Sequence, residues 1–236
     1  MELVIDTSSN LAGVVLAHDG EILTELNWQS KQNHTVELLP NLVWLLRQAN
    51  VDSHSLEAII VAKGPGSYNG LRVGISTAKG LAFSLNIPLL GISTLEAEAY
   101  SFAFTGLPLY PIHKAGREEV ATALYQQKKG EWYCLEGEYL TTVKTLCSRI
   151  KRRALFCGEI LPDMVSEIQQ NLGQRAIIPQ SNRISRAKYL AILGRQRLDK
   201  KEQDELATLQ PLYLRPPNIT RPKERSVQDA SAKIRS

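Results

Sequence analysis

One stretch organises this sequence: Gly64-Pro65-Gly66-Ser67-Tyr68-Asn69-Gly70-Leu71-Arg72-Val73-Gly74. The short apolar run 58–62 before it predicts a buried strand, and residues 75–86 after it have helical spacing. A glycine-rich turn from a strand to a helix supports two interpretations. Its open backbone amides and the positive end of the helix dipole would bind an anion, or its glycines would only supply positive φ angles and close packing.

The segments on either side of this loop extend the pattern. Three short strands come first, over 1–5, 13–18 and 22–28, and the second and third are joined by Asp19-Gly20, a dipeptide typical of tight hairpins. A helix over 35–49 precedes the loop, and a strand over 87–91 follows the loop helix. Ser93 and Glu96 then have capping-box spacing and begin a helix that runs to Phe104. This order predicts a mixed sheet flanked by helices.

The second half of the chain repeats this order. Strands over 109–112, 120–126 and 131–136 precede a helix over 141–150, after which strands and helices alternate to residue 198. The repetition predicts a duplicated α/β fold with two lobes. We divide the chain into a first lobe over 1–105, a second, smaller or degenerate lobe over 106–214, and a basic tail over 215–236 that is predicted to be disordered.

The helix predicted over 35–49 is apolar on more than one side. Six of its apolar residues form one stripe, and three lie off it; the stripe is Val36, Leu39, Leu42, Val43, Leu46 and Ala49, and the others are Leu38, Trp44 and Leu45. One side of this helix can face the sheet and the other something else. The other residues support two interpretations, burial under the chain's own structure or contact with a partner protein.

The net charge of +4 comes from the tail. Residues 215–236 hold six of the 28 basic residues and two of the 24 acidic ones, which leaves 22 of each in the rest of the chain. A solvated tail and a tail that contacts RNA or another acidic partner are both compatible with this distribution.

The composition is that of a globular protein, with 43% hydrophobic and 22% charged residues. No apolar run approaches the roughly 18 residues that a membrane-spanning helix needs, and Glu2 and Asp6 lie where a signal peptide would be basic and then apolar. The three cysteines lack CxxC spacing, so we expect reduced, mostly buried thiols and a cytoplasmic protein.

Several motifs together resemble one protein family. They are Ile5-Asp6-Thr7-Ser8, Asn33-His34-Thr35 leading into Leu38-Leu39-Pro40, the glycine loop followed by Ile92-Ser93-Thr94-Leu95, and Pro211-Leu212-Tyr213-Leu214-Arg215 near the end. In this order they resemble the TsaB family of bacterial tRNA threonylcarbamoyladenosine biosynthesis proteins. The chain departs from the family's loop motif at Asn69, where threonine is usual.

The resemblance implies an actin/Hsp70/sugar-kinase (ASKHA, RNase H-like) fold, with two lobes of mixed sheet flanked by helices. It also implies a noncatalytic scaffold or activator subunit that docks on a catalytic TsaD-type subunit. That complex adds threonylcarbamoyl to N6 of the adenosine next to the anticodon in tRNAs that read codons starting with A. A TsaE-type ATPase and, indirectly, tRNA are further implied partners, and a homodimer of the isolated chain stays open.

In the family the first-lobe helices contact the catalytic subunit. Carried over to this sequence, that surface would be made by residues of the helix over 35–49 and of the helix after the glycine loop, and the residues expected there are Leu38, Leu42, Leu45, Gly74, Ala78 and Ala82.

The resemblance also bears on catalysis. Phosphotransferases of this fold hold a metal with one carboxylate at the start of each lobe. Asp6 is the first candidate, but Lys114 stands where the second is expected, so we expect no catalytic residue and no cofactor here, with ATP and metal on partner subunits. The loop would be a vestigial nucleotide or anion site formed by Asp6, Thr7, Ser8, Gly64, Gly66, Ser67 and Gly70. The alternative is an ASKHA-fold ATPase or small-molecule kinase acting by itself.

Other catalytic classes lack their motifs. No two of the four histidines have i, i+3 or i+4 spacing, which excludes a zincin-type metal site, and His34 is expected to cap or orient its helix start. Asn69 breaks a GxSxG nucleophile elbow around Ser67, and no Gly-Lys-Ser/Thr follows the loop to make a P-loop. A peptidase is therefore disfavoured.

Overall fold

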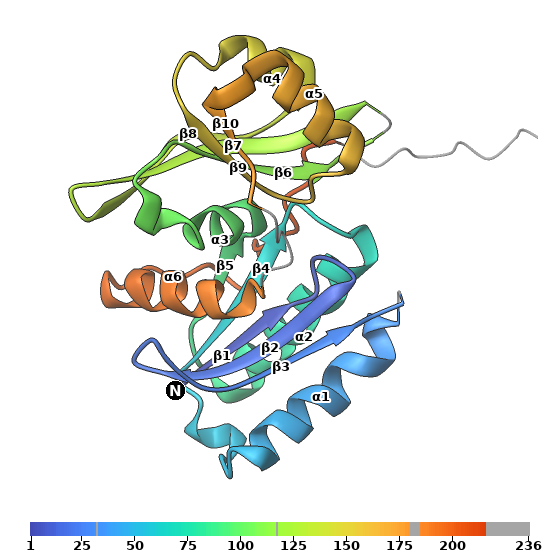
Figure 1. Cartoon of the computed structure of the whole chain (residues 1–236). Helices are drawn as coiled ribbons and strands as arrows, with labels where there is room; N and C mark the ends of the chain where they lie inside the picture. Colours follow the sequence, from blue (N-terminus) through green and yellow to red (C-terminus); the bar gives the residue numbers. More distant parts are fainter. Residues whose placement is uncertain (32, 117, 180–184, 216–236) are drawn as a thin grey trace, which may run out of the picture.

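A computed structural model describes residues 1–31, 33–116, 118–179 and 185–215 of the chain. It consists of two five-stranded mixed sheets with helices between and outside them (Figure 1). The two-lobe α/β architecture predicted from the sequence is confirmed. Apart from Arg215, the basic tail lies outside the described residues. None of the described helices is long and apolar enough to cross a membrane.

The first sheet has the strand order β3-β2-β1-β4-β5. Strand β1 (Glu2–Asp6) is central; β2 (Leu11–His18) pairs antiparallel with it, and β3 (Glu21–Gln29) pairs antiparallel with β2. Strands β4 (Ala58–Gly64) and β5 (Leu89–Ser93) lie on its other side and are parallel to it. The tight turn predicted at Asp19-Gly20 joins β2 to β3, and both residues have positive φ.

The second sheet repeats this arrangement in the order β8-β7-β6-β9-β10. Strand β6 (Leu109–Lys114) is central; on one side β7 (Glu119–Lys128) pairs antiparallel with it, and β8 (Glu131–Thr142) pairs antiparallel with β7. Strands β9 (Ala154–Gly158) and β10 (Ala176–Ile177) are parallel on the other side. The duplication predicted from the sequence is therefore present in the strand order.

Helices cover both faces of each sheet. The outer faces carry α1 (His34–Gln48) and α2 (Tyr68–Leu85) in the first lobe and α4 (Val143–Arg149) and α5 (Pro162–Leu172) in the second. Two further helices, α3 (Thr94–Tyr100) and α6 (Ala187–Asp199), lie between the sheets (Figure 1). Short 3-10 helices span Ser53–Ser55, Ala103–Thr105 and Gly173–Arg175. Each sheet face has its own hydrophobic cluster, which makes four in all.

The lobe boundary differs from the division made on the sequence. Helix α6 packs its buried face, which includes Leu190 and Leu193, on the inner face of the first sheet. The chain then runs along the edge of that sheet as a strap, which we define as residues 204–215. The Asp204 amide donates to Leu89 O at 2.8 Å, and the Leu212 amide donates to Lys63 O at 2.7 Å. Residues 187–215 thus belong mainly to the first lobe, because its inner apolar face needs a cover.

Helix α2 begins earlier than its sequence pattern indicated. It starts at Tyr68, so the second half of the glycine stretch is helical. Ser67 caps it, since its side chain accepts a hydrogen bond from the Gly70 amide. The predicted cap of α3 is also present, with the Ser93 hydroxyl accepting from the Glu96 amide. The true loop is therefore only the few residues between β4 and Tyr68.

Candidate functional site

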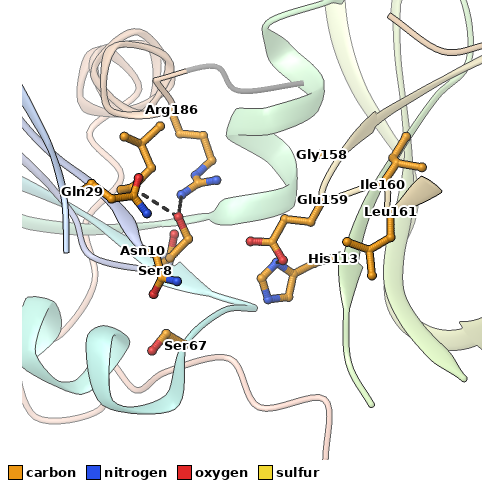
Figure 2. A pocket seen from close by; sticks show the side chains of 12 residues that line it. Ser8, Asn10, Gln29, Ser67, His113, Gly158, Glu159, Ile160, Leu161 and Arg186 are labelled. Atoms are coloured by element: carbon orange, nitrogen blue, oxygen red, sulfur yellow. Dashed lines mark hydrogen bonds and ion pairs between the residues drawn. The ribbon is translucent and has the colours of Figure 1, made fainter. Parts of the chain in front are cut away.

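A cleft of about 630 Å³ opens between the lobes. Its first-lobe wall comes from the β1–β2 turn, the end of β3 and the start of α2, and its second-lobe wall from the ends of β6 and β9. The lining residues are Ser8, Ser9, Asn10, Leu11, Gln29, Ser67, Arg186, His113, Gly158, Glu159, Ile160 and Leu161. Figure 2 shows Arg186 on the first-lobe wall facing the His113 and Glu159 side chains on the other.

Asp6 lies at the end of β1, beside the floor of this cleft, and both of its carboxylate oxygens are engaged. Arg186 Nε donates to Oδ2 at 2.9 Å, while the Ser8 amide, at 2.9 Å, and the Ser8 hydroxyl donate to Oδ1. Asp6 is only 2% exposed. The carboxylate expected to hold a metal therefore already has a cation bound to it.

Arg186 connects three parts of the first lobe. Besides Asp6, it donates through Nη1 to Glu98 Oε2 at 3.4 Å, on α3, and through Nη2 to Ser9 Oγ at 2.6 Å. Burial would lower the pKa of Arg186, but Asp6 and Glu98 raise it above its ordinary value. Burial raises the pKa of Glu98 to about 7, although Arg186 opposes the shift. Arg186 thus stays charged while Glu98 titrates near neutral pH.

The second-lobe wall corrects the position expected for the opposing acid. Asp6 follows Ile5, the last β1 residue paired with β4, and His113 follows Ile112, the last β6 residue paired with β9. The counterpart of Asp6 is therefore His113, whereas Lys114 is exposed one residue further on. His113 Nδ1 lies 3.1 Å from Glu159 Oε2. Burial lowers the pKa of His113, opposed by Glu159.

The glycine loop packs against the β1–β2 turn rather than forming an open cradle. A Cβ on Gly66, Gly70 or Gly74 would come closer than 3.0 Å to atoms of Ser8 or Thr7. Thr7 Oγ1 donates to Gly70 O at 2.7 Å, and the Ser67 amide donates to Ser8 O at 2.7 Å. The structure brings the predicted anion-site residues together, Gly64 included, but their groups bond mainly to one another. Of the two interpretations, close packing fits the structure.

The six residues expected at a partner interface are part of the first-lobe core, and this is a correction. All are buried; they are Leu38, Leu42, Leu45, Gly74, Ala78 and Ala82. Three residues of the predicted stripe on α1 point to solvent, since Val36 is 70% exposed, Leu39 54% and Val43 46%. Trp44, which lies off that stripe, is 48% exposed beside them. Both faces of α1 are apolar, so periodicity could not tell which one packs inward.

The described residues contain no group of three histidine, cysteine, aspartate or glutamate side chains arranged to hold a metal. His34 does not cap α1. It is buried as the first residue of that helix, with neither ring nitrogen hydrogen-bonded, and burial lowers its pKa. Cys147 and Cys157 are buried as expected, whereas Cys134 is exposed.

Sequence reasoning missed Arg186, Glu98 and Glu159. Arg186 lies 180 residues from Asp6, and no local spacing links the two. One signal was available for the buried acids. Glu96 and Glu98 lie in a short, otherwise apolar helix, where acidic residues need basic partners. Glu96 pairs with Arg197 at 2.6 Å and Glu2 with Arg195 at 3.0 Å, so arginines at or near α6 supply those partners.

Comparison with known proteins gives consistent matches. Residues 28–221 match the family model TsaD, tRNA N6-adenosine threonylcarbamoyltransferase. The tRNA threonylcarbamoyladenosine biosynthesis protein TsaB of Bacillus subtilis (strain 168) is 34% identical over 218 residues, which cover 90% of this chain and 93% of that protein. The TsaB of Buchnera aphidicola subsp. Schizaphis graminum is 36% identical over 71% of this chain and 74% of its own length.

Solved structures agree with the fold. YeaZ from Pseudomonas aeruginosa superposes with a TM-score of 0.75 at 25% identity, over 90% of this chain and 99% of its own. The Acidaminococcus fermentans (R)-2-hydroxyglutaryl-CoA dehydratase component A superposes with a TM-score of 0.50 at 10% identity, over 84% of this chain and 98% of its own. The second match concerns the fold alone. The predicted ASKHA-type architecture is confirmed.

Proposed function

This chain belongs to the TsaB family and takes part in the biosynthesis of threonylcarbamoyladenosine in tRNA; we propose that it does so as a noncatalytic subunit that docks on a TsaD-type catalytic subunit. In this proposal ATP and metal are held by partner subunits, among them a TsaE-type ATPase. Contact with tRNA is indirect, and the complex works in the cytoplasm.

The docking surface we propose is the outer face of α1, which we define by Val36, Leu39, Val43 and Trp44. At 100° per residue these side chains share one face, opposite the buried face of Leu38, Leu42 and Leu45. Four large apolar side chains exposed together on one helix are the observation that carries the proposal. A patch of this kind on a soluble protein marks an interaction site.

The identity of the partner is supported by the shared family model. A TsaD model matches this chain over 28–221, so a TsaD-type subunit is expected to have a related fold with corresponding outer helices. Two related chains can then pair outer helix against outer helix, as two copies of one chain do in an isologous contact. The same face would allow self-association when the partner is absent, which equilibrium sedimentation of the isolated chain would detect.

Charged replacement of the outer face tests the docking. Leu39→Glu combined with Val43→Glu is expected to abolish co-purification with the TsaD-type subunit while the melting temperature stays nearly unchanged. Phe104→Glu is the matched control, because Phe104 is 82% exposed and lies outside α1. Co-purification of the double variant at the wild-type level would contradict this interface.

The role in tRNA modification is tested in a depletion strain. Nucleosides from its tRNA are analysed by mass spectrometry, with complementation by wild type or by the Leu39→Glu/Val43→Glu variant. We expect threonylcarbamoyladenosine to disappear on depletion and to return only with wild type. Its persistence after depletion would remove the protein from the pathway.

The alternative, an ATPase or small-molecule kinase acting by itself, has less support because Asp6 is already paired with Arg186. Calorimetry of the isolated chain with magnesium and ATP separates the two functions. Micromolar binding with turnover would favour the enzyme, and the proposed noncatalytic role predicts neither.

A further inference from the structure

The residues of the cleft do not fit the metal that phosphotransferases of this fold use. Magnesium takes oxygen ligands in near-octahedral geometry, and in such enzymes it bridges protein carboxylates and nucleotide phosphates. Asp6 is the one strand-end carboxylate at the two positions concerned, and its Oδ2 and Oδ1 are bonded to Arg186 and Ser8. A metal could reach Asp6 only by displacing a guanidinium that is itself buried.

The opposite wall offers magnesium no better ligand. His113 occupies the position equivalent to Asp6, and an imidazole nitrogen is a poor ligand for this hard cation. The nearest carboxylate there, Glu159, is paired with His113 Nδ1 at 3.1 Å. Among the described residues, neither central strand therefore ends in a carboxylate that lacks a bonded partner.

Arg186 has the properties of a permanent replacement for such a metal. Its positive charge does not depend on pH, and its fork of N–H groups reaches Asp6, Glu98 and Ser9 together. Like a metal, it pairs with two buried acids and joins separate elements, here β1, α3 and the start of α6. Unlike a metal, it has no coordination shell that Asp6 and a phosphate oxygen could share, and it can only donate hydrogen bonds.

We propose that Arg186 is a resident cation in the place of that metal, and that it bars magnesium nucleotides from the cleft while it fastens α6 to β1 and α3. This inference rests on the proposed noncatalytic role and supplies its structural cause. In this proposal Arg186 alone decides whether the cleft binds a magnesium nucleotide. Removing that residue should then restore binding at Asp6.

The test is a gain of binding. Arg186→Met is combined with Glu98→Gln, so that Asp6 keeps its charge without leaving a second unpaired acid. With 10 mM magnesium and 1 mM ADP, the wild-type melting temperature should move by less than about 1 °C. The double variant should gain about 4 °C, as expected for a ligand at roughly ten times its Kd on a chain of this size.

Two controls test whether the rise in melting temperature depends on Asp6 and on the loss of the Arg186 charge. Arg186→Lys keeps a positive charge and should respond like wild type. Adding Asp6→Asn to the double variant should abolish the gain. Should the double variant fail to fold in sodium buffer, magnesium should restore a cooperative melting transition, since the metal then takes the place of the guanidinium.

The outcomes that overturn the proposal are equally direct. They are wild-type binding of magnesium ADP with a Kd below about 100 μM, a folded double variant that shows no shift, and an unfolded one that magnesium does not rescue. Docking is read separately, by capture of the TsaD-type subunit with the α1 variants. A failure of the proposed function and a failure of this inference are therefore distinguishable.

Discussion

The outer helix layers of the two lobes cover sheets of the same strand order but have different surfaces. Among the described residues, α1 and α2 carry six large exposed apolar side chains, whereas α4 and α5 carry none; the six are Val36, Leu39, Val43, Trp44, Tyr68 and Phe83. Both layers bury a core against their sheet. Within the described part of the chain, the two helix layers thus share apolar inward faces, whereas the outward face is apolar in the first lobe's helices alone.

The largest expected effect tests whether the inward faces are equivalent. Leu45 on α1 and Leu146 on α4 are both fully buried. Leu45→Ala and Leu146→Ala should each lower the free energy of unfolding by about 4 kcal/mol, through lost burial and a remaining cavity. Urea denaturation measures both. A loss below about 1 kcal/mol for either variant would mean that the two layers are not packed alike.

The second prediction concerns how closely α2 of the first lobe approaches the β1–β2 turn. Gly70→Ala should cost about 3 kcal/mol, because the new Cβ would collide with the Thr7 carbonyl oxygen. Gly80 is the control on the same helix, since nothing lies within 4 Å of a Cβ there. Gly80→Ala should stabilise the chain by up to about 1 kcal/mol through helix propensity. Equal melting temperatures for both variants would contradict the packing interpretation of the loop.

The third prediction compares two titratable groups, Glu98 on α3 and His113 near the end of β6. Burial raises the pKa of Glu98 to about 7, so folded protein holds a proton there that the unfolded chain releases above its ordinary pKa near 4.5. This group therefore makes the fold less stable as pH rises from 4.5 to 7. Glu98→Gln should remove that loss, and its effect on unfolding free energy should be more favourable at pH 8 than at pH 5 by about 2 kcal/mol.

If Glu98→Gln were more favourable for the free energy of unfolding at pH 5 than at pH 8, the group that titrates would be another residue of the cleft. His113 is the natural comparison, because burial lowers its pKa and its contribution to stability is lost as pH falls below about 6.5. In the His113→Gln variant, the free energy of unfolding should therefore fall less below pH 6.5 than in wild type. Its dependence on pH above 7 should be the same as in wild type. Urea denaturation at a series of pH values separates the two groups.

The smallest expected effect on stability concerns the outward face. Val43→Glu should change the free energy of unfolding by no more than about 0.5 kcal/mol, since the side chain is half exposed and on the surface. Thermal melting at constant pH measures this. A loss comparable to that of Leu45→Ala would show that the outer face of α1 is buried in the free protein.

The order of strands and helices along the chain and the cap of α3 could be predicted from the sequence because they depend on local patterns. Ser93 is the cap of α3 as expected, and α1 begins and ends within one residue of its predicted bounds. The orientation of α1 could not be predicted, since Leu38 and Leu39 begin two apolar faces that periodicity treats alike. The packing of α1 on β2, β3 and α2 decides between them.

The candidate site was harder to predict because it depends on contacts between distant segments. Asp6 was singled out correctly as a strand-end carboxylate, but its partner Arg186 joins it only through the placement of α6. The counterpart of Asp6 was misplaced by one residue, at Lys114 instead of His113, because strand register is fixed by pairing with β9. A shift of one residue along a strand turns the side chain to the opposite face of the sheet, so it changes which side chain faces the cleft.

The placement of α6 and the strap also has a consequence for synthesis on the ribosome. The segment that makes up the second sheet and its outer helices is continuous and is complete by residue 177, whereas the first lobe waits for α6 and for Leu209, which is buried in its core. A nascent chain therefore leaves the inner face of its first sheet uncovered until nearly all of the protein has been translated. The lobe that is made first is the one that is finished last.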